Sequence, residues 1–139
     1  STATRLATGE LQFVQSAPTV LIVATSRSQG ETAAEVARRI GFEPRLAGNG
    51  AEAMEIAREW KPREILTDGT LPDMDASALA RKIRKELGQH PIVIIAWSSN
   101  PELEEKLLSP SGGLDDFVLK SNGRRNDSQL AVAFLAGLR

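Results

Sequence analysis

Hydrophobic residues are grouped along the chain in short continuous runs, separated by segments in which they recur at helical spacing. The two clearest runs follow or begin with a proline (Pro18 and Pro91) and are rich in β-branched residues. Such runs predict strands that are buried on both faces, as in a parallel sheet. Pro44 lies inside a weaker run and indicates an edge strand. The predicted strands are 19–24, 42–47, 65–68, 91–96 and 116–119.

Between these strands, apolar residues recur at i, i+3, i+4 and i+7, the pattern of a helix with one buried face. Ser26 or Ser28 is predicted to cap the first helix, and Asp127 or Ser128 the last. Pro101 is predicted to open the fourth helix. The apolar stripes of the five predicted helices lie at 33–40, 53–60, 76–87, 103–107 and 131–138.

Five strands alternating with five helices predict an α/β fold, a parallel sheet with helices on both faces. In such sheets, ligands and chemistry gather at the carboxyl ends of the strands. Asp68 and Lys120 each follow or end a predicted strand, so we expect both at the same edge of the sheet.

Composition narrows the function classes. The chain has 139 residues, which predicts one domain, and its net charge of −1 gives no reason to expect nucleic acid as a partner. No cysteine is present, which excludes disulfides and thiolate chemistry, and His90 is the single histidine. No apolar run approaches the ~18 residues of a membrane span. We therefore expect a cytoplasmic protein without a membrane contact.

Residues 1–17 lack a clear period and are interpreted as an N-terminal tail or linker, with a short strand at 10–15. Residues 18–139 form the predicted domain. The tail suggests a piece of a larger protein, such as a hybrid kinase or a multidomain regulator.

Six motifs in order resemble the receiver domain of bacterial two-component response regulators over about 120 residues from Pro18. Each is weak alone, and their shared order and spacing carry the resemblance. They are Val20-Leu21-Ile22-Val23, Gly41, Asn49-Gly50-Ala51-Glu52-Ala53, Lys61-Pro62-x-x-Ile65-Leu66-x-Asp68, Asp68-x-x-Leu71-Pro72-x-Met74-Asp75 and Gly113-x-Asp115-Asp116-Phe117-x-x-Lys120.

The resemblance implies a flavodoxin-like, doubly wound sheet of order 2-1-3-4-5 and a set of site roles. Asp68 would accept a phosphoryl group from a histidine kinase, with a divalent metal neutralising the oxygens. Lys120 would contact the phosphoryl group. Phe117 would be the aromatic residue that moves with the switch.

The sequence departs from this family at four positions of the same edge. Ala24 and Thr25 stand where an acidic metal-binding pair is expected, and Ala96 where a Ser or Thr reports the modification. Trp97 replaces a residue that is usually small. Ser98 or Ser99 could supply the hydroxyl if the fourth strand runs two residues further than predicted.

We therefore expect an atypical receiver domain, not an enzyme, with Mg²⁺-dependent phosphorylation weak or lost and no cofactor. Asp68 and Lys120 would form a standing ion pair, with Trp97 covering part of the cleft. The expected partner is a second copy or another protein on the face of helix four, strand five and helix five, about 101–138, and a histidine kinase is a further candidate. Two alternatives stay open. One is a working phospho-acceptor with an incomplete metal shell, in a hybrid histidine kinase for example, and the other is a small-molecule-binding α/β domain.

Overall fold

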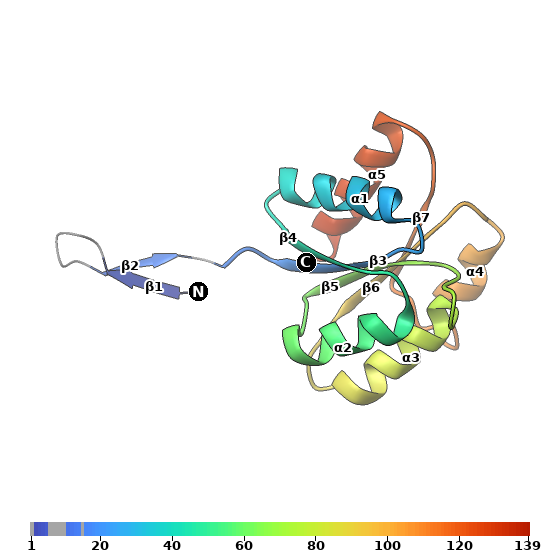
Figure 1. Ribbon diagram of the computed structural model, residues 1–139, viewed down its shortest axis with the longest axis horizontal. Coiled ribbons are helices and arrows are strands. Elements are labelled where there is room, and N and C mark those ends of the chain that lie inside the picture. Colours follow the sequence, from blue (N-terminus) through green and yellow to red (C-terminus); the bar gives the residue numbers. More distant parts are fainter. Residues whose placement is uncertain (1, 6–10, 15) are drawn as a thin grey trace.

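A parallel sheet of five strands forms the centre of the molecule (Figure 1). The computed structural model describes residues 2–5, 11–14 and 16–139. The strands lie in the order β4-β3-β5-β6-β7, which is 2-1-3-4-5 when counted from β3. The predicted fold class is therefore confirmed, and β4 lies at an edge as expected for a strand containing Pro44. The strand bounds are β3 (Thr19–Val23), β4 (Glu43–Ala47), β5 (Glu64–Asp68), β6 (Val93–Ser98) and β7 (Asp116–Leu119).

Helices cover both faces of this sheet. In Figure 1, α1 and α5 lie on one face, and α2, α3 and α4 lie on the other. No helix in the described part of the chain is long and apolar enough to cross a membrane. The helix bounds are α1 (Arg27–Arg39), α2 (Gly50–Trp60), α3 (Ala76–Leu87), α4 (Leu103–Leu108) and α5 (Arg124–Ala136).

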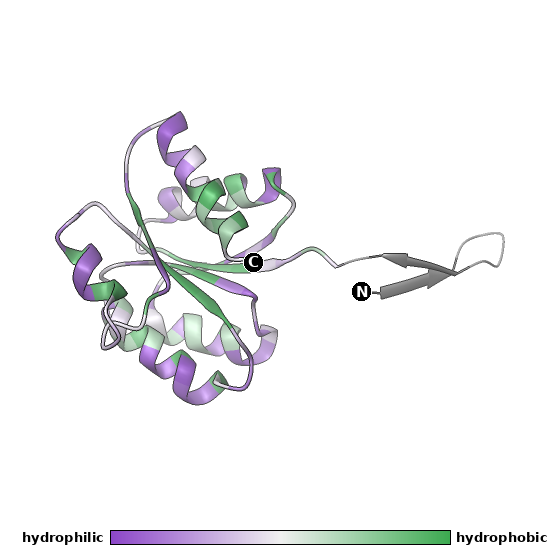
Figure 2. Ribbon diagram, turned by 180° about the vertical axis from the view of Figure 1, so that it is seen from behind, coloured by the Kyte–Doolittle hydropathy of each residue, from purple (hydrophilic) through white to green (hydrophobic). Residues whose placement is uncertain are grey.

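The core consists of two apolar layers, one on each side of the sheet. Successive residues of a strand point to opposite faces, so Ile65 packs toward α2 and α3 while Leu66 packs toward α1 and α5. Both are fully buried. Figure 2 shows the same arrangement, with hydrophobic residues along the sheet and hydrophilic ones on the outer sides of the helices. This double burial explains why the strands read as continuous apolar runs.

An antiparallel hairpin precedes the domain and forms a sheet of its own from β1 (Thr2–Arg5) and β2 (Leu11–Val14). The strand predicted at 10–15 is present as β2, and its two outer residues lie outside the described part of the chain. β1 was not predicted.

The strand ends of β3, β4 and β5 differ from the prediction by one residue, and three other boundaries differ by more. Pro101 does not open the fourth helix, because α4 begins at Leu103 after Glu102. β6 begins at Val93 and ends at Ser98, two residues later than predicted, because it pairs with β5 up to Trp97 and with β7 up to Ser98. The cap predicted at Asp127 or Ser128 is wrong, since α5 begins at Arg124, after Gly123, whose positive φ of 68° turns the chain into the helix. Ser26 does cap α1, where its Oγ accepts a hydrogen bond from the amide of Gln29 at 3.3 Å.

Candidate functional site

The carboxyl ends of the parallel strands bring the predicted site residues together. Asp68 is the last residue of β5, and Trp97 lies beside it on β6. Lys120 follows β7, and Thr25 lies in the turn after β3. Because these strands are parallel, four segments far apart in sequence meet at one edge of the sheet.

Asp68 and Lys120 form an ion pair at this edge. The Lys120 Nζ lies 2.8 Å from the Asp68 Oδ1, and the two side chains are only 20% and 8% exposed. The other carboxylate oxygen, Oδ2, accepts a hydrogen bond from the Thr25 amide at 2.9 Å. Both oxygens of Asp68 therefore already have partners.

Two further groups hold the Lys120 ammonium in place. Its Nζ donates a hydrogen bond to the Gln29 Oε1 at 2.8 Å. It also lies 4.9 Å from the centre of the Trp97 ring, within the range of a cation–π interaction worth about 0.5–2 kcal/mol. The lysine is thus held from three sides, by a carboxylate, an amide and an aromatic face.

Trp97 itself is fixed by a hydrogen bond of its own. It is 3% exposed, and its indole Nε1 donates a hydrogen bond to the buried Asn126 Oδ1 at 3.2 Å. A buried indole N–H needs such a partner. Gln29 and Asn126 were missed from the sequence. Both lie in the first turns of helices, where no motif distinguishes them from ordinary polar residues.

The remaining predicted positions lie around this centre. Ala24 is buried, and Ala96 is fully buried with no hydroxyl to offer. Phe117 is half-buried on β7 and packs against the layer of α2 and α3. Ser98 lines the same hollow as Asp68, and its Oγ accepts a hydrogen bond from the Asn100 amide at 3.1 Å, which leaves the hydroxyl proton available for an acceptor.

The turn after Asp68 is tied to the neighbouring helix. The Asp73 carboxylate accepts hydrogen bonds from the amides of Gly50 at 2.8 Å and Ala51 at 2.9 Å, at the first turn of α2. These bonds keep the pKa of Asp73 below its usual value. An anionic side chain at a helix N-terminus is favourable. Asp73 therefore holds the turn after Asp68 against the first turn of α2.

The sheet order, and the placement of Asp68 and Lys120 at its carboxyl edge, are those that the resemblance to receiver domains implied. The sequence profile of the response regulator receiver domain matches residues 20–131. This chain therefore belongs to the response regulator receiver domain family of two-component signalling. Receiver domains are generally non-enzymatic signalling domains.

Similar proteins of known name agree with this assignment. The DNA-binding response regulator MtrA of Mycolicibacterium smegmatis is 31% identical over 101 residues, which cover 73% of this chain and 43% of that protein. The probable transcriptional regulatory protein TcrX of Mycobacterium tuberculosis is 28% identical over 73% of this chain and 43% of its own length. The chain thus spans less than half the length of these relatives.

Solved receiver structures share the fold. The chemotaxis response regulator CheY4 of Vibrio cholerae superposes with a TM-score of 0.77 at 20% identity, over 87% of this chain and 98% of that one. A receiver domain from Clostridium thermocellum gives a TM-score of 0.74 at 16% identity, over 87% and 94% of the two chains.

Replacing Lys120 with methionine tests the energetic role of the ion pair. Lys120→Met should lower the free energy of unfolding by about 1–3 kcal/mol, because it leaves the Asp68 carboxylate nearly buried without its cation. Urea denaturation measures the loss. The exposed Lys85→Met is the control. If Lys120→Met costs no more than the control, or if its effect simply adds to that of Asp68→Asn, the two side chains are not coupled.

Proposed function

We propose that this receiver domain is atypical: Mg²⁺-dependent phosphorylation of Asp68 is weak or lost, and the signal passes through protein contacts. The observation that carries the proposal is that both Asp68 oxygens are already engaged, one by Lys120 and one by the Thr25 amide. An incoming phosphoryl group would have to displace a lysine held by three groups.

The residues at the site do not fit a magnesium ion. Asp68 is the one carboxylate among the residues that line its hollow, and Ala24 and Thr25 add none. Across the described residues, no group of three or more acidic, histidine or cysteine side chains is placed to hold a metal. Magnesium needs hard oxygen ligands in near-ideal octahedral geometry, so this donor set supports weak binding at most.

The switch is also incomplete. A two-state domain needs about 5.5 kcal/mol of differential binding to move from 1:99 to 99:1. Ala96 has no hydroxyl with which to recognise a phosphoryl group, so one state-specific contact is missing. A domain that lacks this contact fits constitutive contact with a partner better than phosphorylation-driven switching.

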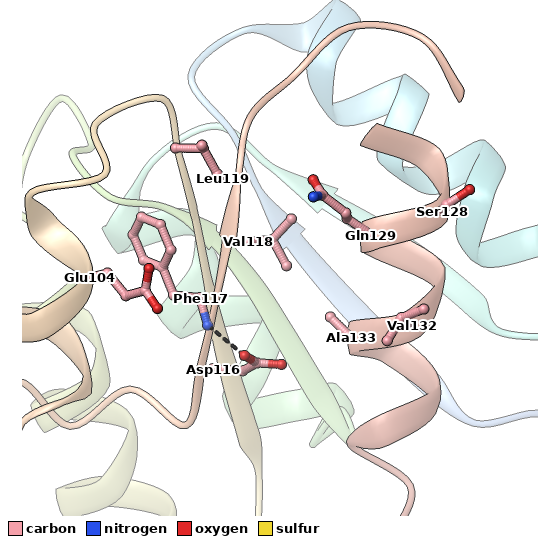
Figure 3. A pocket seen from close by; sticks show the side chains of 9 residues that line it. All are labelled: Glu104, Asp116, Phe117, Val118, Leu119, Ser128, Gln129, Val132 and Ala133. Carbon is pink, nitrogen blue, oxygen red and sulfur yellow. Dashed lines mark hydrogen bonds between the residues drawn. The ribbon is translucent and has the colours of Figure 1, made fainter. Parts of the chain in front are cut away.

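A groove on the face of α4, β7 and α5 supplies a surface for that partner (Figure 3). The hollow is about 430 Å³ in volume. Phe117 and Leu119 project from the edge strand β7 on one side, and Val132 projects from α5 on the other. Val132 is 68% exposed, and Glu104 and Asp116 add negative charge. The surface fits a protein or a second copy that presents apolar side chains beside a basic group.

A working phospho-acceptor is the second candidate, and Ser98 favours it. β6 reaches Ser98, so a hydroxyl does line the Asp68 hollow although Ala96 provides none. In that case a histidine kinase would be the donor, and the chain could belong to a hybrid kinase. Either candidate acts in the cytoplasm. MtrA is a DNA-binding response regulator as a whole protein, and we assign no nucleic-acid contact to this domain.

Site-specific photocrosslinking in cells of the source organism tests the proposed output. A crosslinker at Val132 should capture a protein or a second copy with equal yield in the native sequence and in Asp68→Asn, because contact does not require phosphorylation. The same crosslinker at the exposed Glu55 on α2 should capture neither. A Val132 yield that disappears in Asp68→Asn would show that output depends on phosphorylation. Capture from Glu55 but not from Val132 would place the partner on another face.

A further inference from the structure

A carboxylic acid is buried at the edge of the sheet opposite to Asp68. Glu64 is the first residue of β5 and is fully buried. Its neighbours on the adjacent strands are Val20 and Val93, and both belong to the apolar layer under α1 and α5. Neither carboxylate oxygen has a hydrogen-bond partner. An ionised carboxylate without partners is among the most unfavourable groups to bury.

The last turn of α5 closes over this acid. A Cβ atom added to Gly137 would lie 2.6 Å from the Glu64 Oε2, so any larger residue at this position would force the Glu64 carboxyl group to shift. The Gly137 amide donates to the Ala133 carbonyl at 3.1 Å and therefore does not serve the carboxyl group. The carboxyl group thus lies under a helix turn that offers it no donor.

Positive charge lies nearby without reaching the acid. A hollow of about 440 Å³ at the same edge is lined by Lys61, Arg63, His90 and Arg139, together with Gly137. The Arg63 guanidinium donates to the Leu138 carbonyl at 3.1 Å instead of pairing with Glu64, and His90 is bonded to the Lys61 carbonyl. In the last turn of α1, Arg38 and Arg39 pair with Glu35.

We propose that Glu64 is a proton-dependent latch for the C-terminal turn of α5. The protonated carboxyl group stays in the apolar layer beneath Gly137. Ionisation makes this closed position less favourable, so the turn around Gly137 lifts from the sheet more often when the carboxylate carries a charge and can reach water or the basic hollow. Because α5 also carries Val132 of the groove, the latch connects proton concentration to the partner-binding face. It does not depend on whether Asp68 is phosphorylated.

The electrostatics agree with this geometry. Burial raises the pKa of Glu64 from 4.5 to about 7, and the charge of Arg63 only partly opposes the shift. When the turn lifts, the pKa returns toward its ordinary value. Between pH 6 and pH 8.5, the population of the lifted state should therefore increase about tenfold.

Amide hydrogen exchange, corrected for the intrinsic effect of pH, tests the latch. In the native sequence, protection of the 137–139 amides should fall about tenfold from pH 6 to pH 8.5, while protection of the central α1 amides stays constant. In Glu64→Gln the fall should be absent. In the exposed-acid control Glu43→Gln it should persist. Protection that does not change with pH in the native sequence, or that changes equally in Glu64→Gln, would overturn the proposal. If Glu64→Gln does not fold, NMR titration of the Glu64 carboxyl group in the native sequence replaces this comparison. A midpoint below about pH 5 would contradict the latch.

Discussion

Aspartates at positions 24 and 25 should raise the Mg²⁺ affinity of this domain by at least about 100-fold. A carboxylate about 4 Å from one unit of positive charge is attracted to it by about 4 kcal/mol at an effective dielectric of about 20. If one third of this energy remains after the cost of desolvation, each added carboxylate raises the affinity for Mg²⁺ about tenfold. A hollow of about 120 Å³ beside Ala24 and Thr25 gives the new side chains room. Isothermal titration with MgCl₂ measures the change.

The control for this gain is the double variant Ala24→Asn with Thr25→Asn, which has the same shape without the charge. It should bind Mg²⁺ as weakly as the native sequence. If the native chain already binds at sub-millimolar concentration, or if the two double variants bind alike, the missing carboxylates are not what limits the site.

Replacing Glu64 with glutamine should stabilise the fold increasingly as the pH rises. The pKa of Glu64 is raised from 4.5 to about 7 in the folded state, so the folded chain binds a proton that the unfolded chain has lost. Stability from this group is fully present below about pH 4.5 and is lost as the pH rises to about 7. The difference in unfolding free energy between Glu64→Gln and the native chain should grow by about 2 kcal/mol between pH 5 and pH 8.

Urea denaturation at several pH values gives this difference directly. Glu43→Gln, which removes an exposed acid from the start of β4, should follow the native curve across the same range. Glu64→Leu should show the same pH dependence as Glu64→Gln, with higher stability throughout, because leucine needs no hydrogen-bond partner in this layer. A Glu64→Gln curve parallel to the native one would mean that the acid is already ionised when folded.

The fold could be predicted because double burial leaves a direct trace in the sequence. The runs around Ile22 and Ile94 are apolar at every position, which distinguishes a covered parallel sheet from an alternating strand. Pro44 indicated the edge. Strand ends are harder, because backbone pairing with the neighbours decides them, and this pairing carried β6 to Ser98. For α5, a single glycine at positive φ decided the start, where side-chain caps had been expected.

The site was predictable only in part. Asp68 and Lys120 follow from their places at strand ends, and the structure brings them within 2.8 Å. Gln29 and Asn126 complete the arrangement around Lys120 and Trp97, but their contacts depend on how α1 and α5 lie across the sheet. Glu64 reads as a polar residue at the start of a strand. It is buried because the end of α5 packs closely against it, and the sequence around Glu64 contains no pattern that predicts this contact.

The most direct test of the central claim follows Trp97 while a phosphoryl mimic is added. In a Trp60→Phe background, Trp97 is the single fluorophore of its kind, and it contacts Lys120. Beryllofluoride with millimolar Mg²⁺ should leave its fluorescence unchanged, whereas the variant with aspartates at 24 and 25 should respond. A saturable change in the Trp60→Phe protein that requires Mg²⁺ and disappears with Asp68→Asn would contradict the account and make Asp68 a working phospho-acceptor.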